Sequence, residues 1–136
     1  MTVENEELRL AIGAWKGYMQ KHPEKRARLF TFDAKQYSYD TVLEEMEKGS
    51  ETGRRFAVAV LEHAYLWGEL KRASTIPDAL ANYLDEQQGK IAFVVWGPRG
   101  RHMEPKEIAE ILRKRQSGYE EYVNMYLQTA FEMSGI

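Results

Sequence analysis

The sequence contains no cysteine. This absence excludes disulfide bonds, thiol catalysis, iron–sulfur clusters and cysteine-ligated zinc, and it is typical of a reducing cytoplasm. No apolar run approaches the ~20 residues that a membrane-spanning helix needs. The stretch at residues 1–7 is acidic and no apolar segment follows it, so we expect no signal peptide. The sequence thus predicts a cytoplasmic protein that has no membrane partner.

The chain has little excess of charge of either sign. Nineteen Lys and Arg face 21 Asp and Glu, which gives a formal net charge of −2. Nucleic-acid-binding proteins commonly show a high pI or a basic face, so the composition disfavours that class. Hydrophobic residues make up 43% of the 136 residues, enough for one core. We therefore predict one globular domain over residues 1–136.

The spacing of apolar residues predicts a mostly helical chain. The helix expected over residues 51–72 is apolar almost all round, which indicates a central position. Gly13 and Gly17 in the first helix could mark close packing against another element. The expected helices cover, approximately, residues 4–20, 41–48, 51–72, 76–88, 104–116 and 119–133.

Two segments predict β-structure. Aromatic and polar residues alternate on both sides of Asp33-Ala34, which predicts a β-hairpin over residues 29–39. A short basic link at residues 24–28 precedes it. Lys90–Trp96 contains six consecutive apolar residues, which predicts a strand buried on both faces. The predicted fold is α+β, a predominantly helical single domain packed on a small sheet of one β-hairpin plus one buried strand.

The segment after this strand is a candidate anion site. Two arginines and a histidine follow a Gly-Pro turn and precede a helix expected to begin at Glu104-Pro105. Guanidinium groups beside a helix N-terminus can bind an anion. The candidates for anion or nucleic-acid binding here are Arg99, Arg101 and His102. The segment has no P-loop or GxGxxG pattern, and an exposed turn with solvated charges is the simpler alternative.

Two short resemblances keep a nucleic-acid-binding regulator open. The sequence Pro98-Arg99-Gly100-Arg101 resembles the core of an AT-hook but lacks its second proline. Residues 104–126 are similar to a helix-turn-helix unit, although the link is long and the second helix is acidic. The basic corner of this unit could contact phosphates, and an ordinary helical hairpin with ion pairs is the alternative. Its residues are Arg113, Lys114 and Arg115.

The last expected helix carries a continuous stripe of aromatic and apolar residues. Tyrosine is enriched at protein interfaces because it buries a large area and keeps a polar group. The stripe could pack against its own domain or against another subunit. The candidate interface residues are Tyr119, Tyr122, Tyr126 and Phe131.

The pattern of His, Ser, Asp and Glu shows no catalytic or metal-binding constellation. The three histidines are far apart and fit no metal-binding spacing, and no serine lies in a nucleophile elbow. We predict no metal and no cofactor, and we favour a non-enzymatic protein.

These patterns favour a soluble interaction protein, such as an adaptor, an inhibitor or a small bacterial or phage accessory or immunity-type protein. Its expected partner is another protein or a second copy of itself in a homodimer. The alternatives are a nucleic-acid-binding regulator and a protein that binds a small anion or phosphate ligand.

Overall fold

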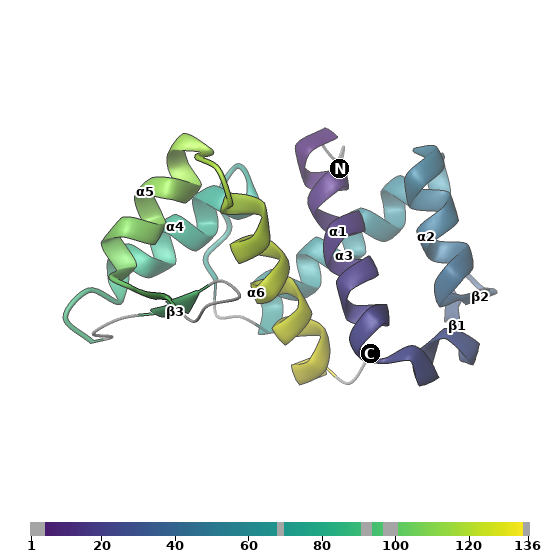
Figure 1. Cartoon of the computed structure of the whole chain (residues 1–136). Coiled ribbons are helices and arrows are strands. Elements are labelled where there is room, and N and C mark those ends of the chain that lie inside the picture. Colours follow the sequence, from purple (N-terminus) through teal and green to yellow (C-terminus); the bar gives the residue numbers. More distant parts are fainter. Residues whose placement is uncertain (1–4, 68–69, 91–93, 97–100, 135–136) are drawn as a thin grey trace.

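The computed structural model describes residues 5–67, 70–90, 94–96 and 101–134. Six α-helices dominate these ranges, and a 3-10 helix, η1 (Pro23–Ala27), follows the first. The helices are α1 (Asn5–Lys21), α2 (Tyr39–Lys48), α3 (Glu51–Trp67), α4 (Ile76–Glu86), α5 (Pro105–Lys114) and α6 (Tyr119–Ser134). α6 lies between the α4–α5 pair and the group formed by α1, α2 and α3 (Figure 1). The prediction of a predominantly helical α+β domain is confirmed.

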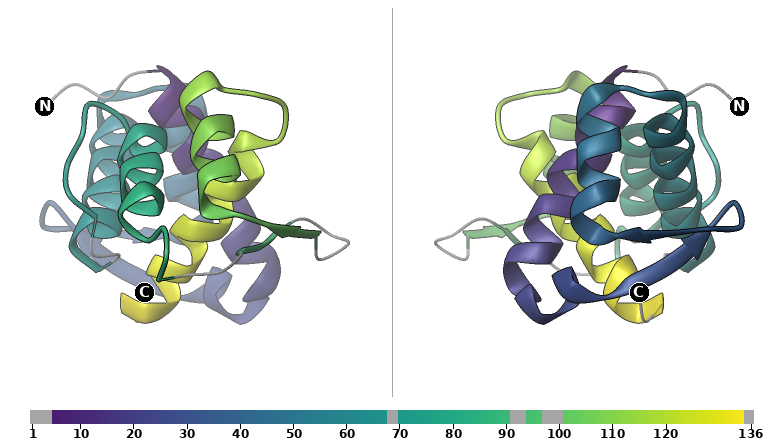
Figure 2. Two further views of the ribbon diagram at one scale, coloured as in Figure 1. Left: turned by 90° about the vertical axis from the view of Figure 1, so that its left-hand side faces the viewer. Right: turned by 90° about the vertical axis from the view of Figure 1, so that its right-hand side faces the viewer.

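The β-structure differs from the predicted single sheet. In the part of the chain that the structure describes, β1 (Leu29–Phe32) pairs with β2 (Lys35–Ser38), and β3 (Val94–Trp96) pairs separately with β4 (Arg101–Met103). The two antiparallel hairpins lie on opposite sides of the helical body (Figure 2). The first hairpin was predicted. The second was not predicted, because Arg101–Met103 shows no alternation of apolar and polar residues and was assigned to a loop. In the structure this segment pairs with β3.

The strand expected at residues 90–96 is only partly described. Residues 91–93 lie outside the described residues, and so do the side chains of 94–96. Its burial on both faces therefore stays a prediction.

The turn of the first hairpin uses two residues with positive φ. Asp33 has φ 52° and Ala34 has φ 62°. Positive φ at both central residues is the type I′ geometry, which matches the twist of the flanking strands. α3 anchors this hairpin, since Arg55 forms an ion pair with Asp33 and Phe32 stacks on Phe56 at 4.1 Å between ring centroids.

Side-chain caps set several helix boundaries. Ser38 Oγ accepts a hydrogen bond from the Thr41 amide at 3.1 Å and begins α2. Gly49, with φ 66°, ends that helix, as the sequence predicts. Ser50 Oγ accepts from the Gly53 amide at 3.0 Å at the start of α3. α3 is described as Glu51–Trp67, and residues 70–73 are not helical, so this helix is shorter than the expected range 51–72.

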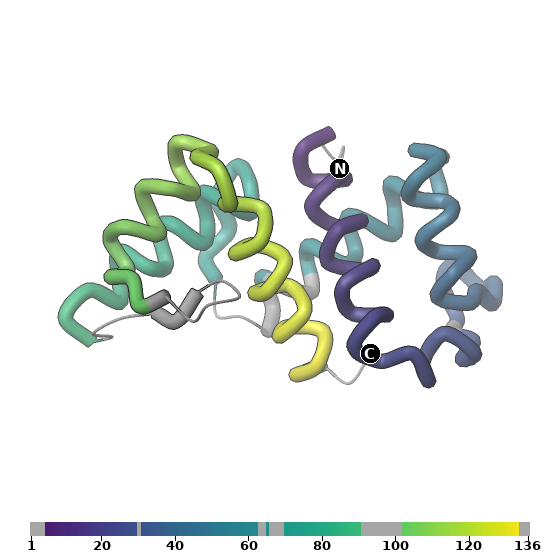
Figure 3. The backbone as a smooth tube through the Cα atoms, in the orientation of Figure 1, coloured from purple at the N-terminus to yellow at the C-terminus, as the bar shows by residue number. Residues whose placement is uncertain are grey.

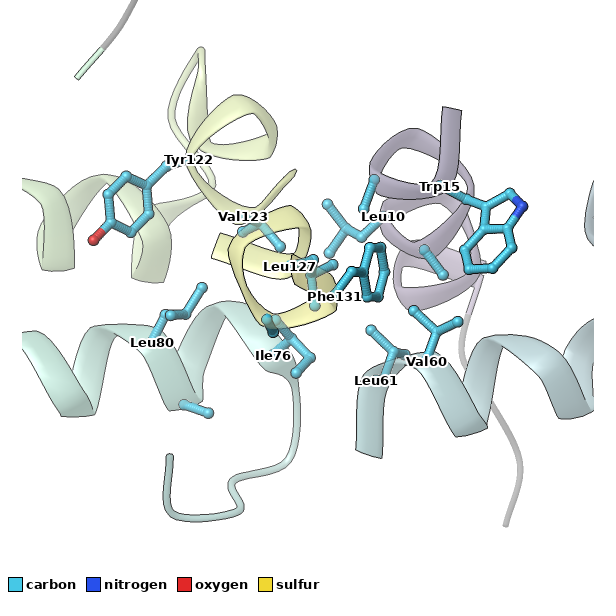
Figure 4. Packing of buried hydrophobic residues seen from close by; sticks show 14 of the residues in the cluster. Leu10, Trp15, Val60, Leu61, Ile76, Leu80, Tyr122, Val123, Leu127 and Phe131 are labelled. Carbon is cyan, nitrogen blue, oxygen red and sulfur yellow. The ribbon is translucent and has the colours of Figure 1, made fainter. Parts of the chain in front are cut away.

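The buried side chains form one cluster with α6 at its centre (Figure 4). Phe131 of α6 points toward Leu10 and Leu61, whereas Tyr122 points toward the α4–α5 side. α3 contributes several buried residues, yet Ala59 on its outer face is exposed. The helix that contacts both groups is therefore α6 rather than α3. The largest fully buried side chains are Tyr18, Phe131, Leu10, Met46, Ile76, Leu80, Leu84, Ile108, Leu112, Leu127, Val42 and Val123.

Two glycines permit the close packing of α1 on α6. A methyl group at Gly13 would lie 2.9 Å from Nδ2 of Asn124, and one at Gly17 would lie 3.1 Å from Cδ of Gln128. Both distances are shorter than normal contacts, so the side chains of α6 would have to move. The close approach expected from the sequence is thus an α1–α6 contact.

Candidate functional site

The basic corner at the end of α5 is joined to other helices of the same chain. Arg115 has φ 52° and follows the last turn of α5. Its guanidinium donates to both carboxylate oxygens of Glu6, at 2.9 Å from Nε and 3.2 Å from Nη2. It also donates to Asp78 Oδ1 at 3.3 Å and to Thr75 Oγ1 at 3.1 Å. One arginine therefore connects the end of α5 with the beginnings of α1 and α4.

Tyr119, at the start of α6, completes this arrangement. Its hydroxyl donates to Glu6 Oε2 at 2.9 Å, and its ring centroid lies 5.8 Å from the Arg115 guanidinium carbon. Arg9 donates to the same hydroxyl at 2.8 Å and pairs with Glu120 at 3.1 Å. We call Glu6, Thr75, Asp78, Arg115 and Tyr119 the Arg115 cluster. It joins four helix ends.

The electrostatics of the Arg115 cluster are favourable at each helix end. Glu6 and Asp78 lie in the first turns of their helices, where a negative charge is stabilised, and Arg115 lies at a C-terminus, where a positive charge is stabilised. Partial burial alone would raise the pKa of both carboxyl groups. Hydrogen bonds from Arg115, Tyr119 and Thr75 outweigh burial and hold the pKa of Glu6 and of Asp78 below their ordinary values. Glu6, Asp78 and Arg115 are therefore ionised at neutral pH.

The other two basic residues of this corner are also paired. Arg113 forms an ion pair with Asp85 and donates to Asn82 Oδ1 at 2.9 Å. Lys114 pairs with Glu110 at 2.6 Å, one helical turn away. All three charged side chains thus take part in contacts within the chain, and the pairs of Arg113 and Lys114 are exposed. Phosphate binding by this corner stays a prediction.

The second hairpin contains the remaining predicted anion ligands. Arg101 and His102 belong to β4, where their backbones pair with Trp96 and Val95, and His102 is exposed. Arg99 and the side chain of Arg101 lie outside the described residues. The anion site expected at these three residues therefore stays a prediction.

The aromatic stripe of α6 packs mainly inside its own chain. Tyr119 and Tyr122 are buried, Phe131 is fully buried, and Tyr126 is half-buried. Burial raises the pKa of Tyr122 to about 12. Packing against the same domain was one of the two arrangements that the sequence left open, and an interface with another subunit stays a prediction.

A groove lined by α1, η1 and α2 is a candidate binding surface among the residues that the structure describes. Its lining residues are Lys16, Met19, Gln20, Pro23, Arg26 and Leu43, and its volume is about 350 Å³. We call this the α1–η1–α2 groove. The three elements are purple to blue in Figure 3, where η1 and α2 lie on the far side of α1 from the α4–α5 pair.

The groove has an apolar floor and a cationic rim. Met19 is buried and Leu43 is half-buried, whereas the charged ends of Lys16 and Arg26 are exposed. η1 is held in place by Lys25, whose ammonium group donates to the Tyr18 hydroxyl at 2.6 Å. An apolar floor with charged groups at its edge is the usual chemistry of a recognition site.

The sequence did not single out the groove residues. Met19 was assigned to the buried face of the first helix, and residues 24–28 were described only as a basic link. The signal that could have found the groove is the concentration of cations around His22-Pro23, where the chain must turn. Their juxtaposition with Leu43 depends on how α2 packs.

Other types of site find no support among the described residues. Within residues 5–67, 70–90, 94–96 and 101–134, no group of three or more His, Asp or Glu could hold a metal ion. No helix in those ranges is long and apolar enough to cross a bilayer. No known protein family, curated protein or solved structure matches the chain.

Proposed function

We propose that the chain is a non-enzymatic interaction protein that binds another protein through the α1–η1–α2 groove. The observation that carries this proposal is the groove itself, whose lining combines buried Met19 with the exposed cations Lys16 and Arg26. Binding sites of this size are typically apolar inside with a few polar groups at the edge.

The distribution of positive charge supports this location. Arg115 of the α5 corner is paired with partly buried acids of the same chain, at 2.9 Å from Glu6. The groove cations take part only in exposed ion pairs, and such pairs stabilise a fold by roughly 0–1 kcal/mol. A partner can therefore replace the groove pairs at little cost, whereas replacing those of the Arg115 cluster would separate helix ends.

Comparative affinity capture tests this function. The chain is immobilised as wild type, as the double variant Lys16→Glu/Arg26→Glu, and as the control Lys71→Glu/Arg72→Glu. The control changes one lysine and one arginine, each in an exposed ion pair, in the segment between α3 and α4. Circular dichroism checks that all three forms are folded.

The proposal expects a specific protein that wild type and control retain and the groove variant loses. A protein retained equally by all three would contradict the groove as the binding site. Light scattering of the free chain tests a second copy as the partner. A dimer that the groove variant alone disrupts would identify that partner.

A further inference from the structure

We infer that the partner segment is an acidic peptide that places one apolar side chain in the α1–η1–α2 groove. This inference rests on the proposed function and specifies the chemistry of the partner at the same site. It follows from the size of the groove, the composition of its rim, and the charge of the neighbouring chain.

The size of the groove suits one side chain. Its volume of about 350 Å³ is at the lower end of the range for ligand pockets, roughly 300–1,000 Å³. Met19 forms the buried part of its lining, and methionine adapts to differently shaped apolar partners because its side chain is unbranched and flexible. Leu43 and Pro23 provide further apolar surface. A leucine, methionine or phenylalanine of the partner would fit this description.

The rim can bind carboxylates on two sides. Lys16 comes from α1 and pairs with Glu47 at 3.4 Å, while Arg26 comes from η1 and pairs with Asp40 at 3.0 Å. The side chains of both pairs are about half exposed, so an incoming carboxylate can replace Glu47 or Asp40. Carboxylates on each side of an apolar residue would meet both cations.

The adjoining segment of the chain contains more basic than acidic residues. Residues 21–28 contain two lysines and two arginines but only one acidic residue, Glu24. Lys21 and Arg28 form no ion pair with any residue that the structure describes. This segment borders the groove through Pro23 and Arg26. A peptide leaving the groove along η1 would therefore meet attractive charges.

The opposite wall favours a peptide over a nucleic acid. Asp40 and Glu47 of α2 pair with the rim cations, and these carboxylates would repel a continuous phosphate backbone. Nucleic-acid affinity depends on neutralising many phosphates at once. A short acidic peptide needs to replace only Glu47 and Asp40, the carboxylates of the two exposed rim pairs.

Nuclear magnetic resonance titration of the isotope-labelled full chain tests the inference. The probe is a blocked pentapeptide with glutamate on both sides of a central phenylalanine. Two analogues separate the contributions, one with serine in place of phenylalanine and one with lysine in place of every glutamate. The amide signals of Met19 and Arg26 report on the groove.

The inference expects saturable shifts of these signals with the phenylalanine–glutamate peptide, weakened by added salt. Each analogue should bind at least about tenfold more weakly, a difference of about 1.4 kcal/mol. The same loss is expected for Lys16→Glu/Arg26→Glu but not for Lys71→Glu/Arg72→Glu.

Equal binding of the serine analogue would overturn the apolar anchor, and equal binding of the lysine analogue would overturn the charge preference. The absence of saturable shifts at millimolar peptide would overturn the inference as a whole. If capture of a cellular protein still depends on the groove in that case, the proposed function stands and only the peptide chemistry fails.

Discussion

The two groups of helices that flank α6 are held to it in different ways. On one side, Phe131 of α6 packs edge-on against Trp15 and Tyr18 of α1, with ring centroids 5.8 and 5.3 Å apart. On the other side, the α4–α5 pair adds a polar connection, the Arg115 cluster, to the apolar contacts of Ile76 and Leu80.

This difference explains why a basic corner need not be a binding site. Where apolar packing joins the helices, cations remain on the surface and can form the rim of the α1–η1–α2 groove. Where helix ends meet, as at Arg115, a cation binds carboxylates of several helices and connects those helices. Arg115 and Arg26 are both arginines beside carboxylates, but Arg115 bridges helices that are remote in sequence, and Arg26 pairs with Asp40 at the surface.

The largest effect is expected from the apolar side of this comparison. Phe131→Ala should destabilise the fold by about 4 kcal/mol, because it removes a fully buried ring and leaves a cavity. Chemical denaturation of wild type and variant measures the difference. The control Thr129→Ala, on the exposed face of α6, should change stability little. A loss below about 1 kcal/mol for Phe131→Ala would show that apolar packing is not the main connection there.

The polar side predicts a smaller effect. Arg115→Ala should cost about 2 kcal/mol, because it leaves partly buried Glu6 and Asp78 without their charged donor. The matched variant Arg113→Ala removes an exposed pair and should cost about 0.5 kcal/mol. Arg115→Lys keeps the charge but loses the bidentate hydrogen bond to Glu6. The stability of this variant should therefore lie between that of wild type and that of Arg115→Ala. Equal costs for the two alanine variants would contradict a special role for Arg115.

Acid should weaken the same connection. The pKa of Glu6 and of Asp78 is lower in the folded chain than the ordinary values of 4.5 and 3.8. Their contribution is therefore complete above pH 4.5 and is lost as the pH falls through the lower folded values. Chemical denaturation at a series of pH values from neutral downward gives the free energy of unfolding. This free energy should fall less steeply with pH for Arg115→Ala than for wild type. Parallel curves would mean that the cluster does not set this dependence.

The smallest effect concerns the first hairpin, far from the Arg115 cluster. Ala34→Gly should raise the free energy of unfolding by about 0.5 kcal/mol. Alanine is strained at φ 62°, and removing this strain stabilises the folded chain by more than the greater entropy of glycine stabilises the unfolded chain. Asp33 should stay unchanged so that its ion pair with Arg55 is kept. Thermal unfolding measures the shift, and a lower midpoint for Ala34→Gly would contradict the strain assigned to this turn.

Local patterns predicted most of the fold. The caps at Ser38 and Thr75 and the turn at Asp33-Ala34 depend on residues within a few positions of one another, so their chemistry is visible in the sequence. The hairpin β3–β4 was missed because Arg101–Met103 is short and shows no alternation of apolar residues.

The candidate sites were harder to predict because they depend on distant residues. Arg115 and Glu6 are separated by 109 positions, and nothing local to Arg115 shows that a carboxylate will meet it. The groove likewise needs Leu43 of α2 beside Met19 of α1. Only the packing of helices brings these side chains together.

Hydrogen exchange of wild type and Arg115→Ala tests the central claim most directly, that this arginine fastens the α4–α5 pair to the rest of the chain. The claim predicts that amides of α4 and α5 exchange faster in the variant by a larger factor than amides of α2 and α3. Unchanged protection of α4 and α5, or the same acceleration in all four helices, would contradict it.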